Sequence, residues 1–323
     1  MAQRRTELPN PRLVPRFAGV ATFCRYPMLA QVAPENQPVD WAIYGYPFDG
    51  GVTFRPGARF GPRAVRDASQ YVKPYSIAHD VDVCQVLSLA DAGDTPICPF
   101  SVKDTLDATV EFATGLGDPA VTRLLAVGGD HSLAYANIKA TWQRRGSPAG
   151  GLAMIHFDSH LDTVDVTGGS KWTHASPFIR AIEEGVLDPS RMISIGIKGP
   201  LNTARDLDYA REHGINVVTY ERWRREGTDP IDRFVADLGS DEVYLTFDID
   251  SIDPTYAPGT GTPCPGGFTS AEAFELLRSL AGINLVGADV VEVLPDRDVA
   301  GTTALLAGHV LFEILCLSAI GQR

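Results

Sequence analysis

The chain has 323 residues, of which 44% are hydrophobic and 21% are charged, and its formal net charge at pH 7 is −12. A chain of this length buries a core large enough to fold without disulfides. The acidic balance argues against a nucleic-acid backbone or an anionic membrane as the main partner. The five cysteines are an odd number without a CxxC pair, which indicates reduced thiols rather than a disulfide framework or a zinc knuckle.

The N-terminal residues 1–38 are proline-rich and irregular, and we expect them to form an arm that packs on the body or on another subunit. They lack the apolar h-region of a signal peptide, and no segment of the chain reaches about 18 continuous apolar residues. We therefore expect a cytoplasmic protein without a membrane span. No linker, repeat or low-complexity segment divides residues 39–323, which predicts a single domain there.

Short apolar runs recur along the rest of the chain. Because they are unbroken rather than alternating with polar residues, they predict strands of a parallel sheet that is buried on both faces. The runs cover residues 41–46, 124–129, 152–157, 192–197, 215–220, 243–249 and 285–293.

Helical patterns lie between these runs, at residues 102–116, 133–146, 175–185, 203–214 and 269–282. The last of them has Thr269 as a predicted N-cap, Glu272 three residues later, and Gly282 where a helix would end. Strands that alternate with helices predict an α/β fold with helices on both faces of the sheet. Ligands bind beyond the carboxyl ends of the strands in such folds.

Acidic and imidazole side chains follow three of the predicted strands. They are Asp130 and His131, then Asp158, His160 and Asp162, and finally Asp248, Asp250 and Asp253. Side chains two residues apart point the same way in an extended chain, so Asp158, His160 and Asp162 can share one face. The same holds for Asp248 and Asp250, whereas Asp253, which precedes a proline, is more typical of a loop hydrogen bond.

A carboxylate buried without a partner costs several kcal/mol, and it therefore pairs, takes up a proton or binds a cation. Together with His131 and His160, the four aspartates Asp158, Asp162, Asp248 and Asp250 supply four negative charges, which balance two divalent cations. Mixed imidazole and carboxylate ligands suit Mn, Zn, Ni, Co or Fe rather than calcium. Two such metals roughly 3.5–4 Å apart share a bridging water and lower its pKa. The sequence therefore predicts a dinuclear metal centre.

Five ordered motifs resemble the ureohydrolase family, which contains arginases, agmatinases and related guanidino-compound hydrolases. They lie at residues 45–66, 128–132, 156–163, 247–267 and 289–293, and the chain is most similar to the agmatinase branch. The resemblance implies a three-layer αβα sandwich with a mainly parallel sheet, and one catalytic domain over residues 39–323. It also implies a trimer or hexamer, with a homologous second subunit as an open alternative, and two divalent cations, Mn²⁺ or Ni²⁺.

The resemblance assigns roles residue by residue. One metal would be held by His131, Asp158, Asp162 and Asp248, and the other by Asp158, His160, Asp248 and Asp250. Glu292 would bind the substrate guanidinium through paired, charge-assisted hydrogen bonds, and Asp130 and Asp289 would orient ligands. A hydroxide bridging the metals at Asp158 would attack the guanidinium carbon, and His174 would protonate the leaving amine. The alternative for His174 is a histidine at a helix start that bonds to backbone.

The substrate beyond its guanidinium is set by residues that depart from the agmatinase pattern, at 174–176 and at Arg297. Trp172 could fill the space of a longer substrate tail, which favours a small substrate such as guanidine or an N-alkylguanidine or biguanide such as metformin. Lys171 and Arg297 could instead meet a carboxylate, unless they are solvated surface charges. The alternatives are therefore agmatine, or a guanidino acid such as guanidinobutyrate or guanidinopropionate.

Three rival classes remain. A two-metal phosphoesterase should show a Gly-Asn-His motif, which the chain lacks. A deacetylase-like enzyme would carry one zinc and fewer carboxylates. A metal-binding, non-catalytic partner subunit of a hetero-oligomer would be expected to have lost ligands, and none of the six is missing.

Overall fold

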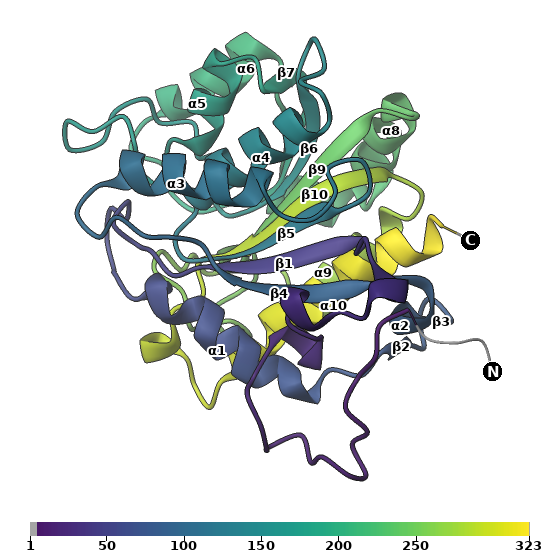
Figure 1. Ribbon diagram of the computed structural model, residues 1–323. Helices are drawn as coiled ribbons and strands as arrows, with labels where there is room; N and C mark the ends of the chain where they lie inside the picture. The colour runs from purple at the N-terminus through teal and green to yellow at the C-terminus, as the bar shows by residue number, and fades with distance from the viewer. Residues whose placement is uncertain (1–4, 323) are drawn as a thin grey trace.

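A parallel sheet of eight strands forms the centre of the computed structural model, which describes residues 5–322 (Figure 1). The strands follow one another across the sheet in the order β4-β1-β5-β10-β9-β6-β7-β8. Their bounds are β1 Trp41–Tyr46, β4 Leu89–Asp94, β5 Arg123–Gly128, β6 Leu152–Phe157, β7 Leu187–Ile197, β8 Asn216–Thr219, β9 Glu242–Asp248 and β10 Asn284–Val291. A separate antiparallel pair joins β2 Tyr75–Ser76 to β3 Val81–Asp82.

The helices have the bounds α1 Gly61–Ala68, α2 Val83–Val86, α3 Val102–Thr114, α4 Leu133–Arg144, α5 Pro177–Glu183, α6 Asp208–His213, α7 Tyr220–Glu226, α8 Asp229–Leu238, α9 Ser270–Ser279 and α10 Thr302–Ile320. Single 3₁₀ turns occupy Phe23–Arg25, Leu29–Gln31, Pro34–Asn36, Ala58–Phe60, Ser69–Tyr71, Ala204–Leu207, Ile249–Ser251 and Pro295–Arg297. The capping box of Thr269 and Glu272 is present at the start of α9, which confirms the predicted helix start.

Two helical layers cover the two faces of the sheet. Helices α3, α4, α5 and α6 lie on one face, and α1, α9 and α10 lie on the other (Figure 1). Alternate strand residues supply the two cores: in β1, Trp41 and Ile43 belong to the core under α10, and Ala42 and Tyr44 belong to the core under α4. The predicted three-layer αβα sandwich is therefore confirmed.

All seven predicted strands and all five predicted helices are present, but several elements were not predicted. Helix α10 is buried nearly all round and has no polar face, so it gives no amphipathic signal. By length and composition it could cross a membrane, with a mean hydropathy of 1.9, yet 83% of that stretch is buried inside the protein. Strand β4 carries Asp91 and Asp94, which hid its strand character; both carboxylates pair with Arg66 of α1.

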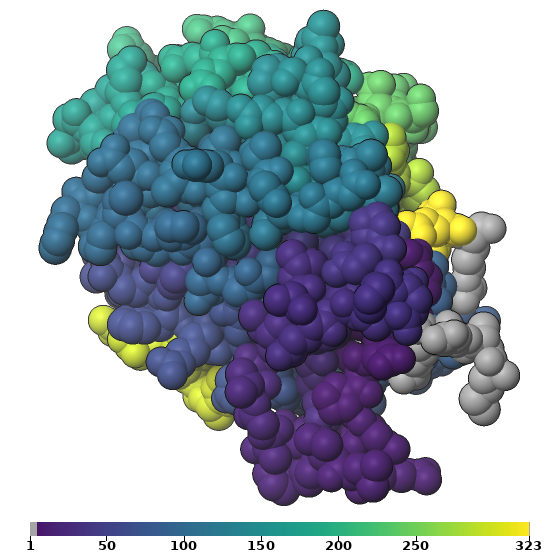
Figure 2. Space-filling view, viewed as in Figure 1, coloured from purple at the N-terminus to yellow at the C-terminus, as the bar shows by residue number. Residues whose placement is uncertain are grey.

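The described part of the arm has no α-helix or strand, and part of it packs on the body. Thr6 is buried, where its N–H donates to Cys84 O at 2.9 Å and its hydroxyl accepts from Leu89 N–H at 2.9 Å. Further along, Phe17 and Val20 are almost fully exposed, on a loop that protrudes from the body (Figure 2).

Candidate functional site

Four adjacent strands end at the predicted site. In the order β5, β10, β9, β6 they lie side by side at the centre of the sheet, so the loops at their carboxyl ends meet. These loops bring together His131 after β5, Glu292 after β10, Asp248 and Asp250 at the end of β9, and Asp158, His160 and Asp162 after β6. The structure thus places all six predicted metal ligands in one cluster.

The first group of ligands surrounds one nitrogen of His131. Its Nδ1 lies 2.9 Å from Asp162 Oδ2, 3.2 Å from Asp158 Oδ2 and 3.4 Å from Asp248 Oδ2. This nitrogen is buried and nevertheless has no hydrogen-bond partner among residues 5–322. A buried nitrogen that faces three carboxylate oxygens without a hydrogen bond to any of them suits an imidazole that shares a cation with those carboxylates.

A chain of hydrogen bonds behind His131 selects the tautomer that a metal requires. The Thr246 hydroxyl donates to Asp289 Oδ1 at 2.6 Å and must therefore accept from His131 Nε2–H, which lies 2.8 Å away. The Tyr244 hydroxyl donates to the other Asp289 oxygen at 2.5 Å. Nδ1 of His131 is left with its lone pair facing the carboxylates, and Asp289 lies where its predicted orienting role needs it.

The second group of ligands surrounds His160. Its Nδ1 lies 3.2 Å from Asp158 Oδ1 and 3.2 Å from Asp250 Oδ2. Asp158 therefore faces both histidines with different oxygens, as a bridging carboxylate would. Asp248 turns Oδ2 toward His131, while its Oδ1 accepts from Asp250 N–H at 2.8 Å. The His160 side chain is 42% exposed, so this end of the cluster opens to solvent.

The buried carboxylates of this cluster repel one another, and their pKa values are shifted in different directions. Burial alone would raise the pKa of Asp158, but the close approach of His131, His156 and His160 holds it well below its ordinary value. Burial, together with the negative charges of Asp250 and Asp158, raises the pKa of Asp248 well above its ordinary value. The cluster thus carries more carboxylates than it can hold ionised without added cations, and its imidazole and carboxylate donors suit divalent transition metals.

One member of the cluster was missed in the sequence. His156 of β6 is fully buried, with Nε2 3.0 Å from Asp158 Oδ2 and Nδ1 3.0 Å from Ser194 Oγ. It could have been found, because it precedes Asp158 by two residues and so extends the same alternation by one position.

Glu292 lies beside the metal ligands and has one oxygen without a partner. Its Oε1 accepts from His131 N–H at 2.9 Å and from the His174 ring Nδ1 at 2.9 Å. Its Oε2 is buried and has no hydrogen-bond partner in the part of the chain that the structure describes. Next to this oxygen, Gly261 leaves room: a Cβ there would lie 3.6 Å from Glu292 Oε2 and 3.1 Å from Arg55 O. Glu292 also has a φ of +65°, a left-handed conformation that is costly for a non-glycine residue.

His174 is clamped between two loops. Nδ1 faces Glu292, and Nε2 accepts from Thr53 N–H at 3.0 Å. Burial alone would lower the pKa of His174, but Glu292, followed by Asp162 and Asp130, raises it to about 9. The Thr53 N–H opposes this rise in the pKa of His174, because it donates to Nε2 and so favours the neutral ring. His174 does lie near a helix start, but its ring bonds to Glu292 as well as to backbone.

Asp130 joins the loop after β5 to the loop that carries Thr53. Its Oδ2 accepts from Gly51 N–H at 2.8 Å, and its Oδ1 accepts from Ser132 N–H at 3.1 Å. A Cβ on Gly51 would lie only 3.0 Å from that Oδ2, so the close approach requires glycine. Burial and the negative charge of Glu292 raise the pKa of Asp130 to about 6.

The three residues predicted to meet the substrate tail do not join this cluster. The Trp172 ring packs edge-on against Tyr135 of α4, with centroids 5.1 Å apart, and lies under the Lys103 ammonium at 5.3 Å. Lys171 and Arg297 are both exposed. The indole therefore holds its loop on α3 and α4, and its contacts do not support the idea that Trp172 shortens the substrate space.

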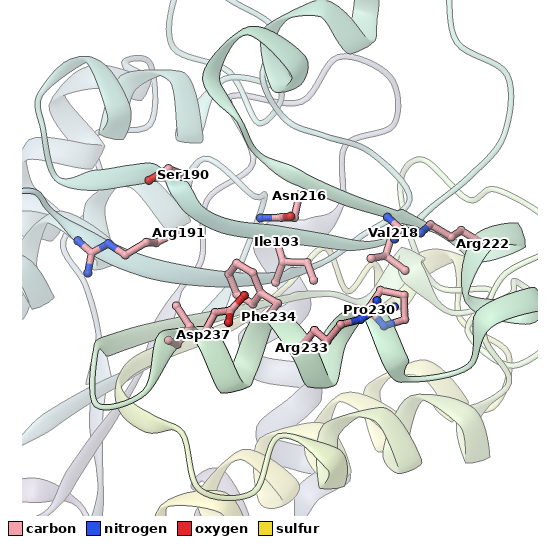
Figure 3. A pocket seen from close by; sticks show the side chains of 11 residues that line it. Ser190, Arg191, Ile193, Asn216, Val218, Arg222, Pro230, Arg233, Phe234 and Asp237 are labelled. Carbon is pink, nitrogen blue, oxygen red and sulfur yellow. The ribbon is translucent and has the colours of Figure 1, made fainter.

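A cavity of about 280 Å³ elsewhere in the fold contains none of the cluster residues. It lies between helix α8 and the strands β7 and β8, and its lining includes Arg191, Asn216, Arg233 and Phe234 (Figure 3).

Several known proteins are similar to this chain in sequence and in structure. The model of the arginase family matches residues 39–317. The guanidinopropionase of Pseudomonas aeruginosa is 41% identical over 311 residues, which cover 95% of this chain and 94% of that protein. A mitochondrial agmatinase of Gallus gallus is 37% identical, over 96% of this chain and 88% of that protein. The structure of proclavaminate amidinohydrolase from Streptomyces clavuligerus superimposes with a TM-score of 0.87 at 37% identity, and covers 95% of this chain and 99% of that one.

Proposed function

The chain belongs to the arginase family and is a hydrolase of guanidino C–N bonds, and from that premise we propose that its substrate is a guanidino acid with a short chain, such as guanidinopropionate or guanidinobutyrate. Water would cleave the bond between the guanidino carbon and the substituted nitrogen. The products would be urea and the corresponding amino acid.

The observation that carries this proposal is the free oxygen of Glu292. A buried carboxylate oxygen without a donor is costly, and a guanidinium supplies donors of matching planar geometry. Gly261, which has no side chain, lies beside this oxygen. Because Oε1 already binds His131 N–H and the His174 ring, the carboxylate cannot easily turn away, and it is held ready for the substrate.

Members of the family hold a dinuclear metal centre, typically manganese, and the two groups around His131 and His160 fit two divalent cations. The fit is supported by the unpartnered Nδ1 of His131 and by Asp158, which presents one oxygen to each group. When bound, such cations act as Lewis acids that activate water near neutral pH. Nickel suits the same ligands and stays the alternative.

His174 would supply a proton to the leaving amine. Its ring is hydrogen-bonded to Glu292, so it stands next to the carboxylate that would hold the guanidinium. Release from Thr53 N–H would free Nε2 to carry the proton. Glu292 would thereby orient the substrate and the proton donor at the same time.

Guanidine or metformin was the substrate that the sequence favoured, and the findings support the alternative better. That expectation depended on Trp172 as a wall of the substrate space, whereas its ring packs on Tyr135 and under Lys103. The relatives are named for guanidinopropionate and agmatine, which both have extended tails. A guanidino acid is preferred to agmatine because the relative named for the acid has the higher identity with this chain.

A substrate panel tests the proposal. We would load the protein with Mn²⁺ or with Ni²⁺ and measure urea, or guanylurea for metformin, and released amine. The substrates are 3-guanidinopropionate, 4-guanidinobutyrate, agmatine, arginine, guanidine and metformin. We expect the highest kcat/KM with one of the two guanidino acids. Highest activity on guanidine or metformin would contradict the proposed tail, and inactivity on all six in both metal forms would favour a non-catalytic partner subunit.

The proposal also includes the number of subunits in the active protein. We expect a trimer or hexamer, and the exposed apolar side chains of the arm, such as Phe17 and Val20, offer a surface for contacts between subunits. Sedimentation of the purified chain would test this, and activity of the chain by itself would show that a homologous second subunit is not needed.

A further inference from the structure

Lys198 is a buried lysine whose ammonium group bonds to the loops that carry the predicted metal ligands. It follows β7, and the residue is only 6% exposed. Its Nζ donates to Ser159 Oγ, to Asp250 O at 2.9 Å and to Ser251 O at 3.1 Å. The three hydrogens of the ammonium group are all used, as the burial of a charged group requires.

The sheet order explains how one side chain reaches both loops. Strand β6 lies between β7 and β9, so a lysine at the end of β7 crosses the end of β6 to reach the turn after β9. On the way, Lys198 N–H donates to Ser159 O at 3.1 Å. Ser159 in turn bonds twice to Asp250, from its N–H to Oδ1 at 3.1 Å and from its hydroxyl to the backbone oxygen at 2.7 Å.

These hydrogen bonds hold the ligands around His160 more directly than the ligands around His131. Ser159 lies between Asp158 and His160, and Asp250 is the second carboxylate that faces His160 Nδ1. His131 is held separately, through Thr246 and Asp289 on the far side of its ring. The lysine therefore fixes the distance between His160 and Asp250, and it has no such hold on the ring of His131.

We propose that Lys198 is a positioning residue for the metal ion on the His160 side. Its ammonium group locks the loop 158–160 against the turn 248–251, so that His160, Asp158 and Asp250 stay close enough for one cation to bind all three. The inference depends on the proposed dinuclear function.

The substitution Lys198→Met separates positioning from folding. Without Nζ, Asp250 O still accepts from the Ser159 hydroxyl, and Ser251 O still accepts from Phe268 N–H at 3.2 Å. No carbonyl is left without a donor, and methionine has a similar unbranched shape. An unbranched side chain matters here, because the lysine Cε lies against Gly267, where an added Cβ would be 2.7 Å away.

The experiment uses the full chain, stripped of metal and then titrated with Mn²⁺. Metal per chain is measured after gel filtration, the two dissociation constants by calorimetry, and spin coupling between neighbouring Mn²⁺ ions by electron paramagnetic resonance. We expect the wild type to bind two ions. Lys198→Met should keep one site unchanged and bind the second ion at least tenfold more weakly, with loss of the coupled signal and an unchanged melting temperature of the metal-free protein.

The matched control is Arg144→Met. This partly buried cation also donates to two backbone oxygens, Thr114 O at 2.7 Å and Thr122 O at 2.9 Å, but it lies on α4. It should keep both sites.

Wild-type affinities at both sites of Lys198→Met would overturn the inference. Equal weakening of both sites together with a lower melting temperature would also overturn it, because the lysine would then be merely structural. If Lys198→Met does not fold, Lys198→Gln decides: it keeps a neutral donor and should weaken the same single site, and wild-type binding would refute the role. A wild-type chain that binds fewer than two ions would overturn the proposed function itself, and the inference with it.

Discussion

Glu292→Gln tests the guanidinium site most directly, because the side chain keeps its shape and loses its charge. The Gln amide oxygen can replace Oε1 and still accept from His131 N–H and the His174 ring. The amide nitrogen then takes the position of the free Oε2 and presents hydrogens to a substrate group that also presents hydrogens. The pairing with the guanidinium is therefore lost, while the rest of the site stays in place.

The magnitude follows from burial. Glu292 is 1% exposed, and breaking a buried charge pair by removing one partner costs about 3–5 kcal/mol. At about 1.4 kcal/mol for each factor of ten, kcat/KM should fall by roughly two to four orders of magnitude. The stability of the free protein should change little, by about 1 kcal/mol or less, since the weaker hydrogen bonds to the amide are offset by the removal of an unpartnered buried charge.

The assay measures urea release, Mn²⁺ per chain and thermal unfolding for the wild type and Glu292→Gln. Glu184→Gln is the control, because that carboxylate accepts from Tyr135 and Lys139 away from the cluster. We expect both variants to keep two metals, and only Glu292→Gln to lose activity. Undiminished kcat/KM in Glu292→Gln would refute the guanidinium role, and loss of metal would show that the carboxylate serves the metals instead.

Three further outcomes follow. Asp158→Ala should lose bound metal and turnover together, since its oxygens face both histidines; an active, metal-free variant would contradict the dinuclear site. In the metal-free protein the pKa of His174 is raised to about 9 from an ordinary 6.5, so the protonated ring should stabilise the fold below pH 6.5, and this stabilisation should be lost as the pH rises through 9. His174→Gln should flatten this part of the plot of melting temperature against pH, and parallel plots for the variant and the wild type would refute the shift. Gly261→Ala should raise KM about tenfold by crowding the space beside Glu292, and an unchanged KM would place the guanidinium elsewhere.

The strand runs and the spacing of the ligands could be predicted because they depend on local rules. A parallel sheet buried on both faces requires unbroken apolar runs, and β1 and β6 have the predicted bounds. The D-x-H-x-D spacing does bring Asp158 and His160 together, but through a turn rather than an extended chain. Strand β6 ends at Phe157, and Asp158 Oδ1 accepts from His160 N–H at 2.6 Å. Residues without such periodicity were missed, as in α10, whose burial on all sides removes the polar face that marks a helix.

Local rules of this kind could not predict which residues from different strands and loops contact one another in the folded protein. Lys198 looks like an ordinary lysine at a strand end, and only the order β9-β6-β7 brings it beneath Asp250. Trp172 was assigned to the substrate because it lies two residues from His174, yet its ring packs on Tyr135 of a distant helix. Sequence distance does not say which face of a loop a side chain occupies, because loops lack the repeating geometry of strands.

The sequence by itself determined the α/β fold class and the ligand types, since these follow from composition, periodicity and spacing along one strand at a time; the family resemblance rested on five motifs. The tertiary structure decided what lies between strands: that Asp158 presents one oxygen to His131 and the other to His160, that His131 keeps Nδ1 free because Thr246, which itself bonds to Asp289, occupies Nε2, and that one oxygen of Glu292 has no donor among the described residues. These features depend on distances of about 3 Å between loops far apart in the chain, and the packing of the whole sheet sets such distances.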